Sequence, residues 1–358
     1  MKKLFVNCLS LALGMLVLFS CKDNGGKTMF TPVSSGRPYE MLVVIDKAMW
    51  ERPAGRALFN VLDTDVPGLP QPERSFRISN IGPEHFDRGM RIFRNIIDVD
   101  IQPIYTQPKL KYARNSYAAP QMIMTIQAPD EASFEEFVTK NRQVILDFFT
   151  KAEMNRQITL LKKKHSDIVS TKVGSMFGCD VWVPVEMDRY KEGQDFLWAS
   201  SDKPSSDVSV NFVIYSYPYT DKDTFTKDYF VHKRDSVLKI NIPGSREGQY
   251  IQTDADYVDV KNFSIKGEYA FEARGLWYME NDMMGGPFVS HARVDRPNGR
   301  VVVVEGFIFA PEKAKRDLMR KMEASLYTLK LPQEQELEEI VVGPGLEEEK
   351  KATEPAQQ

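Results

Sequence analysis

Four segments of this 358-residue chain share one local pattern. In each segment, a short apolar run leads into a turn with Pro or Asp and then into residues spaced like an amphipathic helix. The apolar runs are Met41–Asp46, Met122–Gln127, Asn211–Tyr215 and Val301–Phe309. Because each unit supplies a strand and a helix, the pattern predicts an α+β body. The repetition favours two related halves, each an antiparallel or mixed sheet with helices packed on one face.

Helix and turn signals place several elements more closely. Asp130 can cap the free N–H groups of a long helix that carries Phe134 and further apolar residues at helical spacing. A second helix is predicted over Pro83–Ile97, with proline in its first turn. Pro297–Gly299 predicts a tight hairpin turn, because Asn-Gly accepts the positive φ that such a turn needs. We therefore expect an antiparallel meander in the C-terminal half, covered by a final helix over Lys313–Tyr327.

The N-terminus has the features of a secretory signal. Lys2 and Lys3 precede an apolar stretch that is shorter than the roughly 20 residues of a membrane span. The following Leu18-Phe19-Ser20-Cys21 resembles a bacterial lipobox, in which the cysteine is acylated and becomes the mature N-terminus. Palmitate and further acyl chains on Cys21 would hold the protein stably on a membrane without crossing it. The alternative is a plain signal peptide that contains an incidental cysteine.

These signals divide the chain and give it a location. We expect a lipid-anchored protein of the bacterial cell envelope, at the outer membrane, on either its periplasmic or its surface face. The expected parts are a lipoprotein signal peptide (1–20), a polar, Gly-rich flexible tether (21–36), an N-terminal α+β half (37–172), a C-terminal α+β half (173–331) and a disordered acidic tail (332–358).

Charge and cysteine content narrow the possible functions. The chain has 47 basic and 50 acidic residues and a net charge of −3, which argues against a nucleic-acid partner. Cys8 leaves with the signal and Cys21 is acylated, so Cys179 has no partner for an intramolecular disulfide. A lone cysteine between a glycine and a strand is expected to be buried as a small apolar residue rather than to act as a nucleophile.

Catalytic and metal-binding motifs are missing from the sequence. The four histidines are far apart, and no phosphate-binding glycine loop or nucleophile motif is present. Asp254, Asp256 and Asp259 could offer oxygens to Ca²⁺, but the stretch lacks the glycine and closing glutamate of an EF-hand loop. We therefore expect a solvated strand edge there, and we predict no catalytic residue, metal or cofactor.

The most unusual segment is Arg274–Phe288, which combines two aromatics, an Asn-Asp pair, two methionines and Gly-Gly-Pro. Such a loop could stack a sugar or hold a partner's side chain. The alternative is two strands and a wide turn whose Trp and Met fill the core. Val66–Pro72 is likewise either a stiff partner loop or a rigid connector. The candidate ligand or partner residues are Arg274, Trp277, Asn281, Asp282, Gly285, Gly286 and Phe288.

Four stretches carry a family resemblance: Arg37–Asp46, Val66–Glu73, Gly285–Phe288 and Glu305–Pro311. Together they resemble an uncharacterised lipoprotein family of Bacteroidetes, classed as a domain of unknown function. The resemblance runs from about Ser35 to Leu331. It implies a cell-envelope location, and it supplies no activity and no catalytic residues.

From these observations we expect a noncatalytic binding or structural module for assembly, with a membrane and an envelope protein or glycan as partners. The alternative is a hydrolase of envelope glycans or peptides that uses carboxylates such as Asp46, Asp282 or Glu305. A sugar-binding protein is a third interpretation. It requires that Trp277 or Trp50 be exposed beside polar groups.

Overall fold

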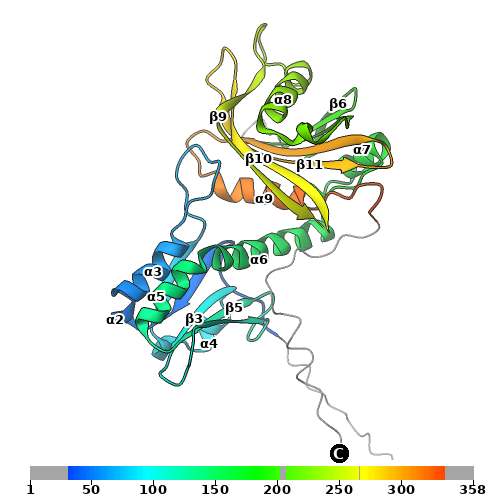
Figure 1. The fold of residues 1–358 in the computed structure, drawn as a ribbon. Coiled ribbons are helices and arrows are strands. Elements are labelled where there is room, and N and C mark those ends of the chain that lie inside the picture. The colour runs from blue at the N-terminus through cyan, green and yellow to red at the C-terminus, as the bar shows by residue number, and fades with distance from the viewer. Residues whose placement is uncertain (1–30, 202–206, 266, 335–358) are drawn as a thin grey trace, which may run out of the picture. The chain divides into compact units, whose positions relative to one another are not determined.

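The computed structural model describes residues 31–201, 207–265 and 267–334, which contain two β-sheets with packed helices (Figure 1). The α+β class is therefore confirmed. The described residues from Val33 onward belong to one compact unit. No helix within these ranges is both long and apolar enough to cross a membrane. The signal segment, Cys21 and nearly all of the acidic tail lie outside the described residues.

The first sheet is mixed and has five strands in the order β2-β1-β3-β5-β4. Its first three pairings are parallel, and β4 adds antiparallel to β5. Strands β1 and β5 and the first three residues of β3 are almost wholly buried, as parallel strands covered on both faces are. The strands are β1 (Glu40–Val44), β2 (Arg77–Ile81), β3 (Asn95–Ile101), β4 (Lys109–Arg114) and β5 (Met122–Ala128).

Helices cover one face of this sheet, as expected, and form its main core with apolar side chains of β1 and β5. They are α2 (Lys47–Trp50), α3 (Pro53–Leu62), α5 (Glu131–Lys140) and α6 (Arg142–Lys163). Asp130 caps α5 by accepting a hydrogen bond from Ser133 N at 2.8 Å, which confirms the predicted helix start. The expected long helix is interrupted at Asn141, which ends α5 and precedes α6.

The helix predicted over Pro83–Ile97 is wrong. This stretch contains only the short η1 (Pro83–His85) and α4 (Arg88–Arg91), and its last residues belong to β3. Ile96 and Ile97 are fully buried between β1 and β5, where an extended, β-branched pair packs better than a helix. Phe86 and Phe93 of this segment instead cover the second face of the sheet.

The second sheet is antiparallel and has seven strands in the order β6-β7-β8-β12-β11-β10-β9. The turn predicted at Pro297–Gly299 joins β11 to β12, and Gly299 has the positive φ of 59°. The strands are β6 (Arg189–Gly193), β7 (Phe196–Ser200), β8 (Ser209–Pro218), β9 (Ile251–Ile265), β10 (Glu268–Met279), β11 (Gly285–Asp295) and β12 (Arg300–Phe309).

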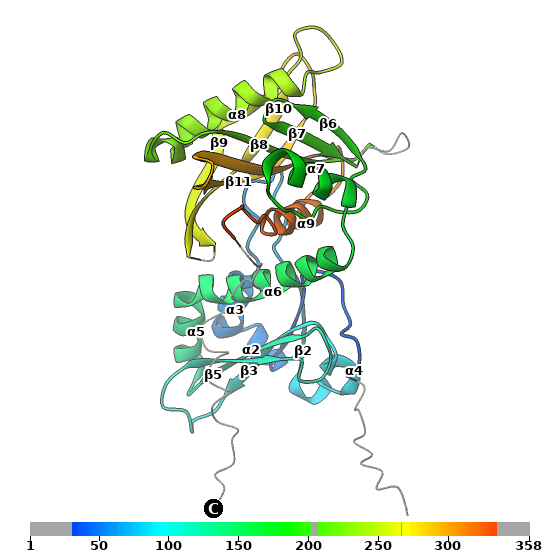
Figure 2. The same ribbon diagram turned by 90° about the vertical axis from the view of Figure 1, so that its right-hand side faces the viewer.

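Helices cover both faces of this second sheet, so the expectation of helices on one face is wrong here. Figure 2 shows α8 on one side and α7 and α9 on the other. The four valines Val301–Val304 are all fully buried, which requires apolar cover on both faces of β12. The helices are α7 (Asp167–Phe177), α8 (Lys227–Asn241) and α9 (Arg316–Leu326), with the short η2 (Lys222–Phe225) before α8.

The limits of the two halves differ from those expected. Helix α7 packs its apolar side chains on the second sheet, so the division falls between α6 and α7 rather than after residue 172. Val33 and Ser35, expected in the tether, form bridges with Ala119 and Phe93, so the packed body begins before residue 37. The two sheets differ in strand number, order and direction, and nothing in them shows that the halves are related.

Candidate functional site

A cavity of ≈ 710 Å³ lies beside the C-terminal part of β9, and we call it the β9 cavity. Its size is in the range of small-molecule and peptide sites. One wall is β9 itself, and the others come from β10, from α6 and α9, which lie side by side, and from the segment that joins α3 to β2 (Figure 1). The α6 wall consists of Gln143, Leu146, Asp147, Thr150, Lys151 and Met154.

One strand, β10, and one helix, α9, place a chain of ion pairs at the base of this cavity. Glu272 and Arg274 are two residues apart on β10 and therefore point to the same face. The Arg274 guanidinium donates to Glu272 Oε1 at 2.7 Å and also to Glu323 of α9. Arg320, one turn before Glu323, donates to its other carboxylate oxygen at 2.9 Å. Two acids thus neutralise two arginines, all of them at most 8 % exposed.

The pKa values of both acids are held low by these contacts. Burial alone would raise the pKa of Glu272, but the hydrogen bond with His291 and the charge of Arg274 outweigh it and lower the pKa. Burial likewise favours a higher pKa for Glu323, but the charges of Arg274 and Arg320 outweigh it and bring the pKa below its ordinary value. Both side chains are therefore ionised at neutral pH, and neither has the raised pKa of a general acid.

Aromatic rings close the base of the cavity. His291 of β11 is fully buried, with Nε2 3.2 Å from Glu272 Oε2. Its ring packs edge-on against Phe263 of β9 and Tyr327, with centroids 5.2 and 4.7 Å away. Burial raises the pKa of the Tyr327 hydroxyl. The base is therefore a preorganised, neutral layer of paired charges and rings.

Strand β9 forms an open edge along the cavity. It is the last strand of its sheet and pairs only with β10 in the described part of the chain. On the cavity face, Asp259 lies opposite Arg274 and Lys261 lies opposite Glu272, so each charge meets its opposite across the strand pair. The cavity residues of this strand are Asp259, Val260, Lys261, Phe263, Ser264 and Ile265.

The residues predicted to form a ligand loop do not form a single loop but lie in different parts of the second half. Arg274 is part of the cavity base. Trp277 is 3 % exposed and donates its indole N–H to Ile308 O at 3.2 Å, and Phe288 lies in the same buried cluster. Gly286 and Gly285 pair with Trp277 and Tyr278 in the β10–β11 hairpin. The structure therefore brings this group together as core.

Asn281 and Asp282 form the turn of this hairpin. Asn281 has a φ of 57° and donates to Gly248 O, and Asp282 accepts from Gln249, Met283 N and Met284 N. These bonds stabilise a wide turn and use the polar atoms that a ligand would need. Trp50 is 6 % exposed and Trp277 is 3 % exposed, so neither meets the condition set for the sugar-binding interpretation.

The three carboxylates considered for hydrolysis are not brought together. Asp46 caps α2 by accepting from Met49 N at 2.9 Å, and Asp282 belongs to the hairpin turn. Glu305 is fully buried and binds the Arg234 guanidinium at 2.7 Å. Each acid thus has a separate structural role.

The cysteine and the three aspartates that were considered for chemistry have structural positions: Cys179 is buried, and the aspartates lie on a strand edge. Cys179 is 5 % exposed, and burial raises the pKa of its thiol to about 12, so the expected burial is confirmed. Asp254, Asp256 and Asp259 lie on the edge strand β9. No group of three or more His, Cys, Asp or Glu side chains within the described ranges could hold a metal ion.

The segment Val66–Pro72 packs against the second half as a connector. Pro67 lines the β9 cavity, and Leu69 packs with the core between the second sheet and α9. Gly68 has a φ of 75° and approaches Arg274 so closely that a Cβ would lie 3.1 Å from the Arg274 Cβ. The segment therefore holds one cavity wall in place.

Sequence reasoning missed most of the cavity. One signal was available: Glu272 and Arg274 stand two apart in Tyr269–Met279, a stretch with no other charged residue, so both charges lie on the same face of the strand. The contributions of His291, Glu323 and Lys261 have no local signal, because these residues come from three other elements.

Comparisons with known families place a domain boundary at the same position as the packing of the helices does. Residues 34–162 match the family model of a domain of unknown function, DUF8532, and residues 166–328 match that of another domain of unknown function, DUF4837. The boundary between them falls at the α6–α7 connection. No curated protein matches the chain. The chain is thus similar to two domain families, neither of which has an assigned activity.

Proposed function

We propose that the chain is a lipid-anchored protein of the bacterial cell envelope that binds an extended segment of a partner protein in the β9 cavity and catalyses no reaction. The observation that carries this proposal is the open edge of β9 inside a cavity. Unpaired backbone groups of an edge strand are a template for an added strand. An extended peptide can therefore form hydrogen bonds with more of these backbone groups than a compact small molecule can.

The length of the open β9 edge sets the size of this occupant. An added strand lies about 4.8 Å from its neighbour and advances about 3.4 Å per residue. The seven residues from Asp259 to Ile265 would therefore pair with a segment about 20 Å long. Backbone pairing of this kind supplies affinity, and alternate side chains supply specificity.

Charge alternation along β9 indicates which peptide would fit. Asp259, Lys261 and Phe263 share the cavity face, with Arg274 and Glu272 behind the two charges. A basic residue beside Asp259 and an acidic residue beside Lys261 would each meet an opposite charge. Phe263, packed against His291, offers an aromatic surface to an apolar residue.

The ion pairs at the cavity base favour binding over hydrolysis. A glycosidase needs one carboxyl with a raised pKa to protonate the leaving group. Glu272 and Glu323 both have lowered pKa values and hold arginines rather than an open substrate position. A cavity whose charges are already paired can orient a ligand without transferring protons to it.

Site-specific photocrosslinking in intact cells tests this function. A benzophenone amino acid in place of Ser264, in the cavity wall, should give a discrete protein adduct. The same probe in place of Tyr257, on the same strand but 63 % exposed and outside the cavity lining, is the matched control. Peptide mapping should locate the Ser264 adduct in one linear segment of the partner.

A blocking variant completes the test. Val260→Pro removes a backbone N–H from the edge strand and should abolish the Ser264 adduct, whereas Val260→Thr should keep it. Equal adducts from the Ser264 and Tyr257 positions, or an adduct that consists of glycan alone, would contradict peptide binding in the cavity.

The proposed anchor has its own test. Its support is the sequence Leu18-Phe19-Ser20-Cys21 after a secretory signal. Because several acyl chains anchor a protein stably, Cys21→Ala should move the protein from the membrane fraction to the soluble fraction. Partitioning into the detergent phase that does not change in this variant would exclude acylation at Cys21.

A further inference from the structure

Ser34 and Ser35, near the start of the described chain, are fixed to the segments that precede β3 and β5, at the N-terminal ends of these two central strands. Ser34 N donates to Ala119 O at 3.0 Å, and Ser35 N donates to Ile92 O at 2.9 Å. The Ser35 carbonyl accepts from Arg94 N at 3.0 Å. These bonds give the chain a defined direction at the point where it joins the body.

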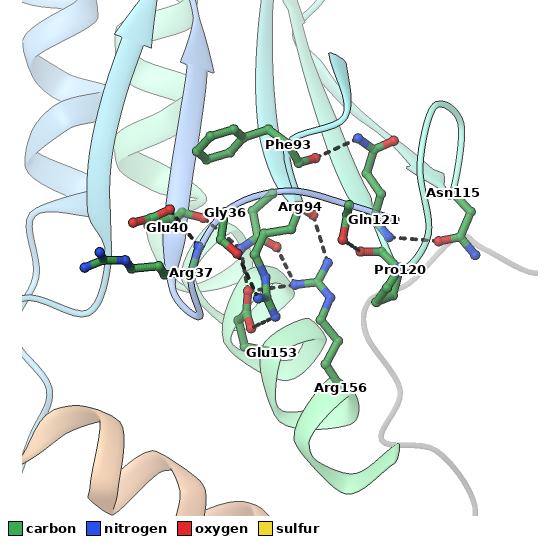
Figure 3. A network of polar contacts seen from close by, with 12 residues as sticks. Gly36, Arg37, Glu40, Phe93, Arg94, Asn115, Pro120, Gln121, Glu153 and Arg156 are labelled. Atoms are coloured by element: carbon green, nitrogen blue, oxygen red, sulfur yellow. Dashed lines mark hydrogen bonds and ion pairs between the residues drawn. The ribbon is translucent and has the colours of Figure 1, made fainter. Parts of the chain in front are cut away.

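A buried polar network lies behind this junction (Figure 3). Arg94 donates to Gly36 O at 3.3 Å and to the Glu153 carboxylate at 2.7 Å. Glu153 is 1 % exposed and also accepts from Asn95 and Arg156, at 2.6 and 2.7 Å. Each of these side chains makes at least one hydrogen bond within the group, while the buried Arg94 Nε has no partner. The bonds that are formed hold the junction against α6.

Apolar side chains surround the same junction on the outside. We define the N-terminal surface by Val33, Arg88, Met90, Arg91 and Tyr117. Val33 is 80 % exposed, and Met90 and Tyr117 are each about 40 % exposed, so all three side chains present apolar surface to the outside. Backbone bonds and bridges join the segments that carry Val33, Arg91 and Tyr117 at the N-terminal ends of β3 and β5, and the Arg91 guanidinium also lies over the Tyr117 ring.

The arginines of this surface are available for an outside anion. The Arg91 guanidinium lies 5.5 Å from the rings of Phe86 and Tyr117 and donates through Nε to Phe86 O at 3.2 Å. Neither Arg88 nor Arg91 forms an ion pair with any residue that the structure describes. The nearby acids are engaged otherwise. Asp87 caps α4, and Glu84 lies 3.4 Å from His85.

The length of the chain before this surface places it near the anchor. Eleven residues lie between Cys21 and Val33. Such a stretch spans at most about 40 Å when fully extended. If Cys21 is acylated, the N-terminal surface cannot move farther than this from the lipid headgroups.

We propose that the N-terminal surface lies against anionic lipid headgroups and so orients the body on the membrane. The proposal rests on the proposed acylation of Cys21. Arg88 and Arg91 contact phosphates, while Met90, Val33 and Tyr117 enter the boundary between headgroups and acyl chains, where apolar and aromatic side chains are favoured. The junction transmits this contact to the whole first sheet.

Vesicle binding by the unacylated chain tests the surface apart from the anchor. The chain from Lys22 to Gln358 is mixed with vesicles of phosphatidylglycerol and phosphatidylethanolamine, and the bound fraction is measured by sedimentation. We expect binding that weakens as salt rises and is absent with phosphatidylcholine vesicles. The Arg88→Glu/Met90→Asp variant should bind at least tenfold more weakly, since each arginine near an anionic surface contributes about fivefold.

The matched control carries the same changes on the other half. Arg246→Glu/Met283→Asp alters an exposed arginine and a fully exposed methionine, and it should bind like the unchanged chain. Circular dichroism checks that both variants fold, and Arg88→Gln should give a smaller loss than the charge reversal. Equal loss in both double variants, or no binding of the unchanged chain to anionic vesicles, would overturn the proposal.

Mass spectrometry of the protein from cells separates this proposal from the anchor. Acylated Cys21 together with no vesicle binding would support the proposed anchor and contradict the proposed membrane contact of the N-terminal surface. Vesicle binding that is lost only in Arg88→Glu/Met90→Asp supports the surface whatever the state of Cys21.

Discussion

Arg234 of α8 and Glu305 of β12 face each other inside the second half with no exposed surface on either side chain. The guanidinium contacts the carboxylate at 2.7 and 2.9 Å and donates to Thr253 Oγ1 at 2.8 Å, and Ser290 donates to Glu305. The desolvation penalty of each charge is therefore offset by its partner and by the two hydroxyls.

The stability of this pair depends on having both members. Arg234→Met leaves a buried carboxylate without its cation and should lower the free energy of unfolding by about 3–5 kcal/mol. The double variant Arg234→Met/Glu305→Leu removes both charges and should recover part of that loss. Urea unfolding of the single and double variants measures the difference. Equal destabilisation of the two would show that the pairing itself contributes little.

At the scale of elements, close backbone packing decides the position of the β10–β11 hairpin. A Cβ at Gly286 would lie 2.0 Å from Ile308 O, so no side chain fits between β11 and β12 at this point. Trp277 uses the same carbonyl for its indole N–H. The Gly-Gly-Pro run is therefore explained by close contact between strands.

Two glycine substitutions should have opposite effects on stability. Gly286→Ala forces a shift of the β12 backbone and should cost about 1–3 kcal/mol in the free energy of unfolding. Gly174→Ala, within α7, meets its nearest atom at 3.8 Å and should be neutral or slightly stabilising, because alanine favours helices. Thermal unfolding of both variants tests the pair. A neutral Gly286→Ala would mean that the strands can separate without cost.

The ion pairs that join β10 to α9 should make the free energy of unfolding depend on pH in the acidic range. The pKa of Glu272 is lower in the folded chain than the ordinary value of about 4.3, so the unfolded chain binds protons more readily. This contribution is complete above about pH 4.3 and is lost as the pH falls further. Glu272→Gln should therefore be less stable at neutral pH and lose less stability between about pH 5 and pH 3.

The free energy of unfolding as a function of pH measures this effect. Glu136→Gln, an exposed acid on α5, is the control and should follow the unchanged chain. If Glu272→Gln has the same pH slope as the unchanged chain, the low pKa of Glu272 does not contribute to acid sensitivity.

At the scale of the whole molecule, the two halves are joined by specific bonds. Glu73, which precedes β2 in the first half, accepts from Lys315 N at 2.7 Å and from Arg316 N at 2.9 Å. These are free N–H groups at the start of α9, which has no capping side chain of its own. The first half thus caps a helix of the second.

Removal of this cap should weaken the connection between the halves. Glu73→Ala leaves two N–H groups of α9 without acceptors and should cost about 1–2 kcal/mol in the free energy of unfolding. Hydrogen exchange at Lys315 and Arg316 should become faster, while exchange in β1 and β3 should not change. Unchanged exchange at both amides would show that water replaces the Glu73 carboxylate.

The sequence by itself determined the features that depend on neighbouring residues. The α+β class, the Asp130 cap, the turn at Asn298 and Gly299 and the buried Cys179 all follow from local pattern. These predictions succeeded because capping, turn geometry and apolar spacing act over a few residues. The helix predicted over Pro83–Ile97 failed because burial between β1 and β5 outweighed local propensity.

Only the tertiary structure decided where the candidate site lies. Arg274 and Glu323 are 49 residues apart, and they meet because α9 packs across β11 and β12, next to β10. Lys261 faces Glu272 because of the register of β9 and β10, and a shift of one residue would turn it to the other face. Strand register and helix packing depend on contacts far apart in the sequence, so the site was determined by the fold as a whole.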